Sequence, residues 1–259
     1  MQTKKILLLT GKGMSTDVLY NALSGEFVIT AVLMEDPVPK GVLLKNRIRR
    51  LGLTKVSGQL LFKLLLEPLL RRSAGKRLAR IMEEYGLSDK PVPEGKIIRI
   101  GSVNADRCRE VLKEYRPDIV VVNGTRIISG KTLESVPAIF VNTHVGITPD
   151  YRGVHGGYWA LVNRDPVRCG VTVHLVDKGI DTGPILYQAP IHPERGDNFT
   201  TYPLIQAGVG IGLMKKALND LMRAGRPGGA MGKDTDKGAL WTHPTLWGYL
   251  WYRLTRGVR

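Results

Sequence analysis

The sequence predicts an α/β fold built around a mostly parallel, Rossmann-like sheet. Several short runs are almost wholly apolar, such as FVITAVLM at residues 27–34, and this is typical of strands buried on both faces. Helical segments separate these runs, which is the order that produces parallel strands. The 30 glycines and 15 prolines fall mainly between the runs and mark turns.

The N-terminal part begins the alternation. Residues 4–10 predict a first buried strand, and a helix near 16–23 follows the turn GKGMST. The apolar start is too short for a signal peptide. The turn lacks the third glycine of a dinucleotide fingerprint, because Thr16 stands there. Either a turn whose N–H groups face an anion or a purely structural turn fits.

Residues 40–92 interrupt the alternation with an insertion of helical composition, broken at Pro68 and at several glycines. From Lys40 to Arg80, twelve lysines and arginines accompany a single acid, Glu67, in a chain whose net charge is +15. Such a basic segment predicts an anionic partner, which could be nucleotide phosphates, a membrane surface or nucleic acid.

The remaining elements return to the sheet. Asn104 is expected to cap the helix that follows the strand at 96–102. We expect a catalytic domain over residues 1–224 and a C-terminal extension over 225–259. The other predicted strands are 118–124, 138–144, 169–177 and 183–191, and the other predicted helices are 129–136, 156–162 and 201–224.

Cysteine usage and hydropathy indicate the compartment. Cys108 and Cys169 offer neither a disulfide framework nor a metal-ligand spacing, so we expect no metal and a cytoplasmic location. No apolar run approaches the length needed to span a bilayer.

A candidate site lies in VNTHVGITPDYRG, residues 141–153. Asn142 and His144 stand where a strand gives way to a loop, and ligands of parallel sheets bind at the carboxyl ends of strands. Asp181 lies further along in the turn Gly-Ile-Asp-Thr-Gly. An amide, an imidazole and a carboxylate that converge can stabilise an oxyanion and move a proton. A capping amide and a buried structural histidine are the alternative.

These motifs resemble the folate-dependent formyltransferase family. Asn-x-His, Tyr-Arg-Gly (151–153), Gly-Val-Thr-Val-His (170–174) and Asp-Thr-Gly-Pro-Ile-Leu (181–186) occur in the family's order. The resemblance covers roughly residues 95–220 well and 1–36 loosely. It implies the formyltransferase type of Rossmann-like sheet, 10-formyl-tetrahydrofolate as cosubstrate, and Asn142, His144 and Asp181 as the catalytic residues.

The resemblance also implies binding residues. Arg126 departs from the apolar residues expected in its loop, which indicates a side chain that points outward toward the acceptor or the folate glutamate. His155 contacts the acceptor or occupies the rim, and His174 is interpreted as structural. The expected cosubstrate-binding residues are Asn123, Gly124, Thr125, Arg126, Ile127, Asp177, Gly179 and Ile180. The expected acceptor-binding residues are Gly11, Lys12, Gly13, Tyr151, Arg152, His155 and Tyr158.

The acceptor is inferred by comparing branches of the family. Methionyl-tRNA formyltransferases carry a further barrel domain, and glycinamide ribonucleotide enzymes lack the 40–92 insertion and the aromatic tail. The sequence looks most like sugar N-formyltransferases of the GDP-perosamine type, which act in O-antigen synthesis. The alternatives are glycinamide ribonucleotide or another amine as acceptor, and a non-catalytic basic module that binds membrane or nucleic acid. Nucleic acid is the less favoured partner.

The insertion and the tail allow two interpretations. Apolar and aromatic residues stand beside cations at 56–80 and 241–259, which fits an interfacial helix on an anionic membrane. Alternatively, both segments pack on the core or form a homodimer contact. Absence of binding to anionic vesicles at low salt would exclude the membrane interpretation.

Overall fold

A seven-stranded sheet forms the centre of the computed structural model, which describes residues 4–224 and 238–259. The strand order is β3-β2-β1-β4-β5-β7-β8, with parallel pairing from β3 to β5 and antiparallel pairing of β7 with its neighbours. The mostly parallel sheet is confirmed. The strands are β1 (Ile6–Gly11), β2 (Ile29–Glu35), β3 (Ile97–Arg99), β4 (Ile119–Asn123), β5 (Ile139–His144), β7 (Gly170–Leu175) and β8 (Ile185–Pro190).

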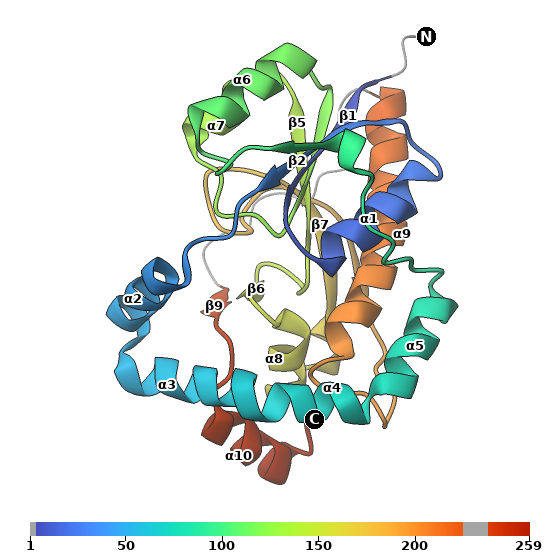
Figure 1. Ribbon diagram of the computed structural model, residues 1–259. Coiled ribbons are helices and arrows are strands. Elements are labelled where there is room, and N and C mark those ends of the chain that lie inside the picture. The colour runs from blue at the N-terminus through green and yellow to red at the C-terminus, as the bar shows by residue number, and fades with distance from the viewer. Residues whose placement is uncertain (1–3, 225–237) are drawn as a thin grey trace.

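Helices cover both faces of the sheet, as the continuous apolar strands predict (Figure 1). Ile6 and Leu8 of β1 pack in the cluster that includes α1 and α9, whereas Leu7 and Leu9 pack toward α6. The helices of this part are α1 (Met14–Ser24), α6 (Asp106–Tyr115), α7 (Gly130–Leu133), α8 (Gly156–Val162) and α9 (Tyr202–Ala224), with short 3-10 turns at Glu94–Lys96 and Pro166–Arg168.

The insertion is helical, as predicted, and its middle part runs as one long rod along the lower side of the molecule (Figure 1). Val56, Phe62 and Leu70 are buried, so this inward face holds the rod on the domain. The insertion comprises α2 (Lys40–Leu51), α3 (Leu53–Leu61), a π-helical turn (Phe62–Leu66), α4 (Glu67–Ser73) and α5 (Gly75–Glu84).

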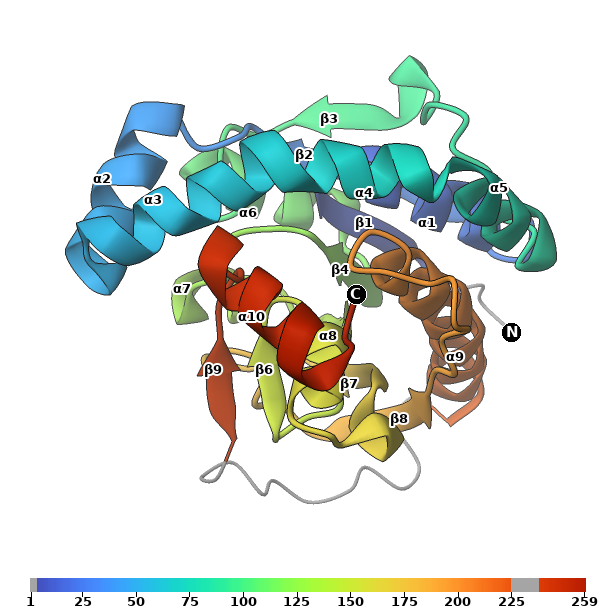
Figure 2. The ribbon, with the colours of Figure 1, turned by 90° about the horizontal axis from the view of Figure 1, so that it is seen from below.

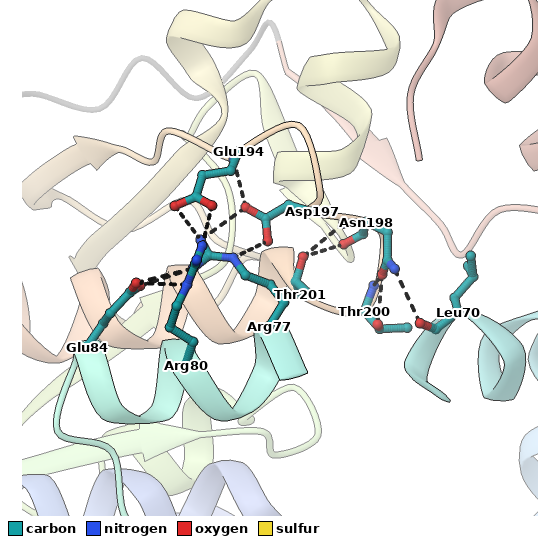
Figure 3. Close-up of polar contacts among 9 residues, drawn as sticks. All are labelled: Leu70, Arg77, Arg80, Glu84, Glu194, Asp197, Asn198, Thr200 and Thr201. Atoms are coloured by element: carbon teal, nitrogen blue, oxygen red, sulfur yellow. Dashed lines mark hydrogen bonds and ion pairs between the residues drawn. The ribbon is translucent and has the colours of Figure 1, made fainter. Parts of the chain in front are cut away.

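A buried ion pair fastens the end of the insertion to the loop before α9 (Figure 3). Arg77 Nε donates to Asp197 Oδ1 at 2.9 Å, and Arg77 Nη2 donates to Asp197 Oδ2 at 3.2 Å. The Asp197 carboxylate raises the pKa of the Arg77 guanidinium. Asn198 adds a hydrogen bond from its amide to the Leu70 carbonyl oxygen. These contacts hold the end of the insertion against the segment that leads into α9.

The C-terminal extension packs on the same body. Strand β9 (Ala239–Trp241) pairs in parallel with β6 (Tyr151–Gly153), and α10 (Leu246–Arg256) lies against α3 (Figure 2). Tyr249 of α10 is fully buried, with its ring centroid 5.0 Å from that of Phe62. The Gly-rich part of the predicted tail, residues 225–237, lies outside the described residues.

Two local predictions are wrong. The strand predicted at 96–102 covers only Ile97–Arg99, because the chain turns at Gly101 with a positive φ. Asn104 does not cap α6, whose N-cap is Ala105. Its side chain instead donates to the Ile127 carbonyl oxygen at 2.9 Å and accepts from the Ser129 N–H at 2.8 Å. Asn104 therefore fixes the loop that follows β4.

Among the described residues, no helix combines the length and the apolar character needed to cross a membrane. Cys108 and Cys169 are both free and buried. Burial raises the pKa of the Cys108 thiol to about 11, which keeps it protonated and unreactive at neutral pH.

Candidate active site

A cavity of about 770 Å³ opens at the carboxyl ends of β4 and β5. Asn142 and His144 line it because residues two apart in a strand face the same side. His174 on β7 and Asp181 in the following loop line it as well. The structure therefore brings together the three residues predicted to be catalytic and adds a second histidine.

The His144 ring is held between two hydrogen-bond acceptors. Its Nε2 lies 2.8 Å from the Tyr151 carbonyl oxygen, and its Nδ1 lies 3.3 Å from Asp181 Oδ2. Since a carbonyl oxygen only accepts, Nε2 carries the proton of the neutral ring. A second proton on Nδ1 would lie between the ring and the carboxylate. Gly146 permits this approach, because a Cβ there would lie 2.9 Å from His144 Nε2.

The loop from β7 to β8 holds Asp181 in place. Asp177 Oδ1 accepts from the Gly179 N–H at 3.0 Å and from Thr182 Oγ1 at 2.7 Å, which closes a tight turn. Asp181 itself has a φ of 53°, a left-handed conformation that aspartate and asparagine tolerate better than most residues. Its Oδ2 also accepts from the Gly153 N–H at 3.2 Å.

His174, which the sequence indicates to be structural, is buried and contacts the predicted site. Its Nδ1 lies 2.8 Å from the Leu175 carbonyl oxygen, so Nδ1 carries the proton of the neutral ring. The free Nε2 then accepts from Asn142 Nδ2 at 3.2 Å and lies 3.7 Å from Asp181 Oδ1. His174 thus orients the Asn142 amide, which keeps a second N–H available.

Burial and charge act against each other in this cluster. Burial lowers the pKa of His144 below its ordinary value, although the Asp181 carboxylate acts to raise it. Burial acts to raise the pKa of Asp181, but the hydrogen bond and positive charge that His174 and His144 supply when protonated, together with the Gly153 N–H, hold that pKa below its usual range. At neutral pH the cluster therefore contains a carboxylate and a neutral His144 ring, poised to exchange a proton.

The loop after β4 forms the next part of the cavity wall. All eight residues predicted to bind the cosubstrate line the cavity; their binding role stays a prediction. Arg126 is fixed toward β2: its backbone N–H donates to Glu35 Oε1 at 2.6 Å, and its Nη2 donates to the Asp36 carbonyl oxygen at 2.5 Å. Glu35 therefore anchors this loop.

Two segments distant in sequence complete the cavity. The sequence predicts an anionic partner for the basic insertion, which could be nucleotide phosphates, but it singles out none of the cavity-lining residues of either segment. One face of α2 contributes Leu43, Arg47, Arg50 and Leu51, and the segment before α10 contributes residues 240–243. Gln59 of α3 links the two, since it accepts from Arg47 Nη2 at 2.7 Å and donates to the His243 carbonyl oxygen at 2.6 Å. The i, i+4, i+7, i+8 spacing on α2 was the available signal.

Several residues predicted to bind the acceptor are placed elsewhere. Tyr151 donates from its hydroxyl to Asp165, and Arg152 donates to the Gly238 carbonyl oxygen at 2.6 Å. Tyr158 is buried among aromatic rings. His155 does line the cavity, with its ring centroid 4.4 Å from that of Phe199. Within the described part of the chain, the predicted residues outside the cavity lining are Gly11, Lys12, Gly13, Tyr151, Arg152 and Tyr158.

The GKGMST turn still borders the site through Ser15, which lines the cavity. Gly11 is required for packing, because a Cβ there would lie 2.4 Å from the Gly124 carbonyl oxygen. No group of three or more metal-ligating side chains occurs among residues 4–224 and 238–259.

Comparison with known proteins identifies the domain that contains this cluster. Residues 84–202 match the formyl transferase family model, and this range includes Asn142, His144, His174 and Asp181. The chain carries a formyl transferase domain. The match begins after the basic helices, so α2–α4 of the insertion lie outside the matched residues.

Relatives and solved structures agree with this assignment. Methionyl-tRNA formyltransferase of Halothermothrix orenii is 30% identical over 133 residues, which are 51% of this chain and 42% of that protein. Phosphoribosylglycinamide formyltransferase of Mycobacterium tuberculosis is 42% identical over 88 residues, 34% of this chain and 40% of that protein. The chain thus aligns with less than half the length of each.

A crystal structure described as a likely sugar N-formyltransferase from Mycobacterium tuberculosis shares the fold. Its TM-score is 0.57 at 18% identity, and the superposition covers 92% of this chain and 75% of that one. The α/β formyl transferase fold predicted from the sequence is therefore confirmed.

Proposed function

We propose that this chain transfers a formyl group from 10-formyl-tetrahydrofolate to the amine of a nucleotide-linked amino sugar. One observation carries the proposal: a single cavity joins the Asn142–His144–Asp181 cluster to a cationic wall made by Arg47 and Arg50. The cluster suits addition of an amine to a carbonyl, and the arginines suit an acceptor that carries phosphate.

The reaction begins when the neutral amine attacks the formyl carbon. The carbonyl oxygen becomes an oxyanion, to which the Asn142 amide donates the N–H left free by its contact with His174. The amine loses its proton to the Asp181 carboxylate through water. The bond between the formyl carbon and N10 then breaks, and N10 takes a proton from the His144–Asp181 pair, giving a formamide and tetrahydrofolate.

The proposed cosubstrate is supported by the match to the formyl transferase family model and by the loops that line the cavity. Asn123–Ile127 and Asp177–Ile180 surround one part of the cavity, where Val122, Ile128 and Val176 provide apolar surface for a flat ring. The proposed acceptor is supported by the cations Arg47 and Arg50, and by the description of the superposed M. tuberculosis structure as a likely sugar N-formyltransferase.

Two other acceptor classes are favoured by the sequence relatives, which are named for methionyl-tRNA and for phosphoribosylglycinamide. Both acceptors carry phosphate and an amine, so the same wall would face them. The acceptor experiment must therefore include all three classes.

The test incubates the protein with 10-formyl-tetrahydrofolate and nucleotide-linked 4-amino sugars, with glycinamide ribonucleotide and methionyl-tRNA in parallel. Formation of tetrahydrofolate and of a product heavier by one formyl group is measured. Asn142→Ala is expected to lower kcat by about 10²- to 10³-fold, the usual effect of removing one oxyanion donor. Asp181→Asn, which suits the left-handed backbone, is expected to lower kcat by about 10²-fold or more.

Asp150→Asn is the matched control, because Asp150 lies in the loop after β5, outside the cavity lining of the described residues, and pairs with Arg168. Turnover only with the ribonucleotide or the tRNA would keep the reaction and replace the acceptor. Full activity of folded Asp181→Asn and His144→Ala variants, or no transfer to any acceptor, would overturn the proposal.

A further inference from the structure

The outer side of α10 is apolar at helical spacing. Trp247, Leu250, Trp251 and Leu254 follow one another at i, i+3, i+4 and i+7, and each is exposed, up to 84% for Leu254. The opposite side carries the buried Tyr249. An amphipathic helix normally turns its apolar side to the core, but α10 uses one apolar side for packing and leaves another uncovered.

The rod formed by α3 and α4 repeats this arrangement. Its inward residues are buried, whereas Leu53, Leu60, Leu61, Leu64, Leu65 and Leu69 are exposed, with Leu64 at 70%. A charged residue would be expected at such positions on an ordinary water-exposed helix.

The two apolar surfaces adjoin. Trp247 of α10 packs on Gly58 of α3, where an added Cβ would lie 2.3 Å from the indole ring. Leu61, Leu65 and Leu69 continue from Gly58 in steps of three and four residues, along the side of the rod that receives Trp247. Seen from below, one end of α10 lies beside α3, and the helix runs away from α4 (Figure 2). We call the exposed apolar residues of α3–α4 and α10 the apolar face.

Cations surround the apolar face. Lys55, Lys63, Arg71 and Arg72 are exposed on the rod, and Arg253 is exposed on α10. Glu67 is the one acid in the sequence from Lys40 to Ser73, and α10 contains none. Leucine and tryptophan set among lysine and arginine are the chemistry of helices that lie in the interface of an anionic bilayer.

We propose that the apolar face docks on an anionic lipid bilayer. The positive charge around the apolar face favours an anionic bilayer as its partner over a second copy of the chain. Two such faces in contact would place their cations against each other, and these would repel. The indoles of Trp247 and Trp251 suit the headgroup level of a bilayer, where an amphipathic ring is partly wet.

The apolar face and the cavity of the formyl transferase domain are connected through segments that belong to both. Residues 240–243 line the cavity and lead into α10, and Gln59 on the rod bonds to the His243 carbonyl oxygen. The surface and the site are therefore built partly from the same segments. The proposal concerns binding alone and stands apart from the choice of acceptor.

The test is sedimentation of the full chain with lipid vesicles. Vesicles that contain phosphatidylglycerol are expected to bind it at low salt, and pure phosphatidylcholine vesicles much less. Raising the salt to about 1 M, where the Debye length is about 3 Å, is expected to weaken binding at least about tenfold. Leu64→Glu and Leu254→Glu are each expected to weaken binding by a similar factor.

Val28→Glu is the matched control, because Val28 is 73% exposed and precedes β2, so it adds the same charge away from the apolar face. Circular dichroism checks that each variant folds, and turnover in solution without lipid is measured separately. Binding that persists in Leu64→Glu and Leu254→Glu, or absent binding at low salt, would overturn the proposal. So would a lipid-free dimer that Leu254→Glu dissociates in the ultracentrifuge.

Discussion

Asn142 lies directly opposite His174 in the antiparallel pairing of β5 with β7, and their side chains meet at 3.2 Å. The Leu175 carbonyl fixes the proton on His174 Nδ1, so the amide must present its nitrogen to Nε2. The orientation of the proposed oxyanion donor therefore depends on a tautomer set on the neighbouring strand.

His174→Phe tests this dependence. The variant removes the acceptor for the Asn142 amide while keeping an aromatic ring on β7. We expect kcat to fall about tenfold to a hundredfold with KM little changed, because only the transition state uses the oriented donor. Steady-state kinetics checks it beside a thermal melt, and an unchanged kcat would show that another group orients the amide.

The cationic wall predicts a change in acceptor binding. Arg50→Gln removes one cation from the cavity, and we expect KM for a phosphate-bearing acceptor to rise about tenfold while kcat stays nearly constant. Arg49→Gln removes a neighbouring exposed arginine that lies outside the cavity lining in the described residues. Equal effects of the two variants would indicate a general effect of charge instead of a specific contact.

The buried His155 leads us to expect that the free energy of unfolding falls at acid pH. Burial, with a smaller effect of His243, lowers the pKa of His155 from 6.5 to about 3. Between pH 6.5 and about 3, His155 is protonated in the unfolded chain but stays neutral in the folded chain. The stabilisation is therefore complete above pH 6.5 and is lost, at about 1.4 kcal/mol per pH unit, as the pH falls toward 3.

His155→Asn measures this contribution. Asparagine tolerates the φ of 58° at this position and does not titrate. Urea unfolding between pH 7 and pH 4.5 is expected to show a shallower dependence of the unfolding free energy on pH in the variant. Parallel curves for the two proteins would contradict the buried, neutral state of His155.

The buried pair of Arg77 and Asp197 predicts a large loss of stability when one partner is removed. The Asp197 side chain is fully buried, so Arg77→Met leaves an uncompensated charge and is expected to cost about 3–5 kcal/mol. The double variant Arg77→Met/Asp197→Asn should recover part of that loss. Arg80→Met, at a half-exposed arginine, should cost less than about 1 kcal/mol in the same urea unfolding.

The sequence predicted the sheet and most helix positions, because these depend on local patterns, and it predicted that Asn142, His144 and Asp181 meet, while their catalytic role stays a prediction. Apolar runs define strands, and the Asn142–His144 spacing places two side chains on one face. The role of His174 could not be predicted, since it depends on the register between β5 and β7. The Asn104 cap was wrong because a distant loop offered better hydrogen-bond partners than its own helix.

The residues that line the cavity could not all be predicted from the sequence for the same reason. Arg47, Arg50 and His243 reach the cavity only through tertiary packing of the insertion and the extension. Tyr151 and Tyr158 stand in the right motif, yet their side chains turn toward Asp165 and toward the aromatic cluster. Proximity in sequence to the active-site loop did not determine which side chains face the cavity.

The division of the cavity wall has a consequence for how such a protein can diversify. The residues proposed to react come from β5, β7 and the loop after β7, whereas another part of the cavity wall comes from α2 and residues 240–243. Substitutions in that wall can reshape or recharge it without displacing His144 or Asp181. A change of acceptor therefore needs substitutions only in the insertion and the extension, while Asn142, His144 and Asp181 are inherited without change.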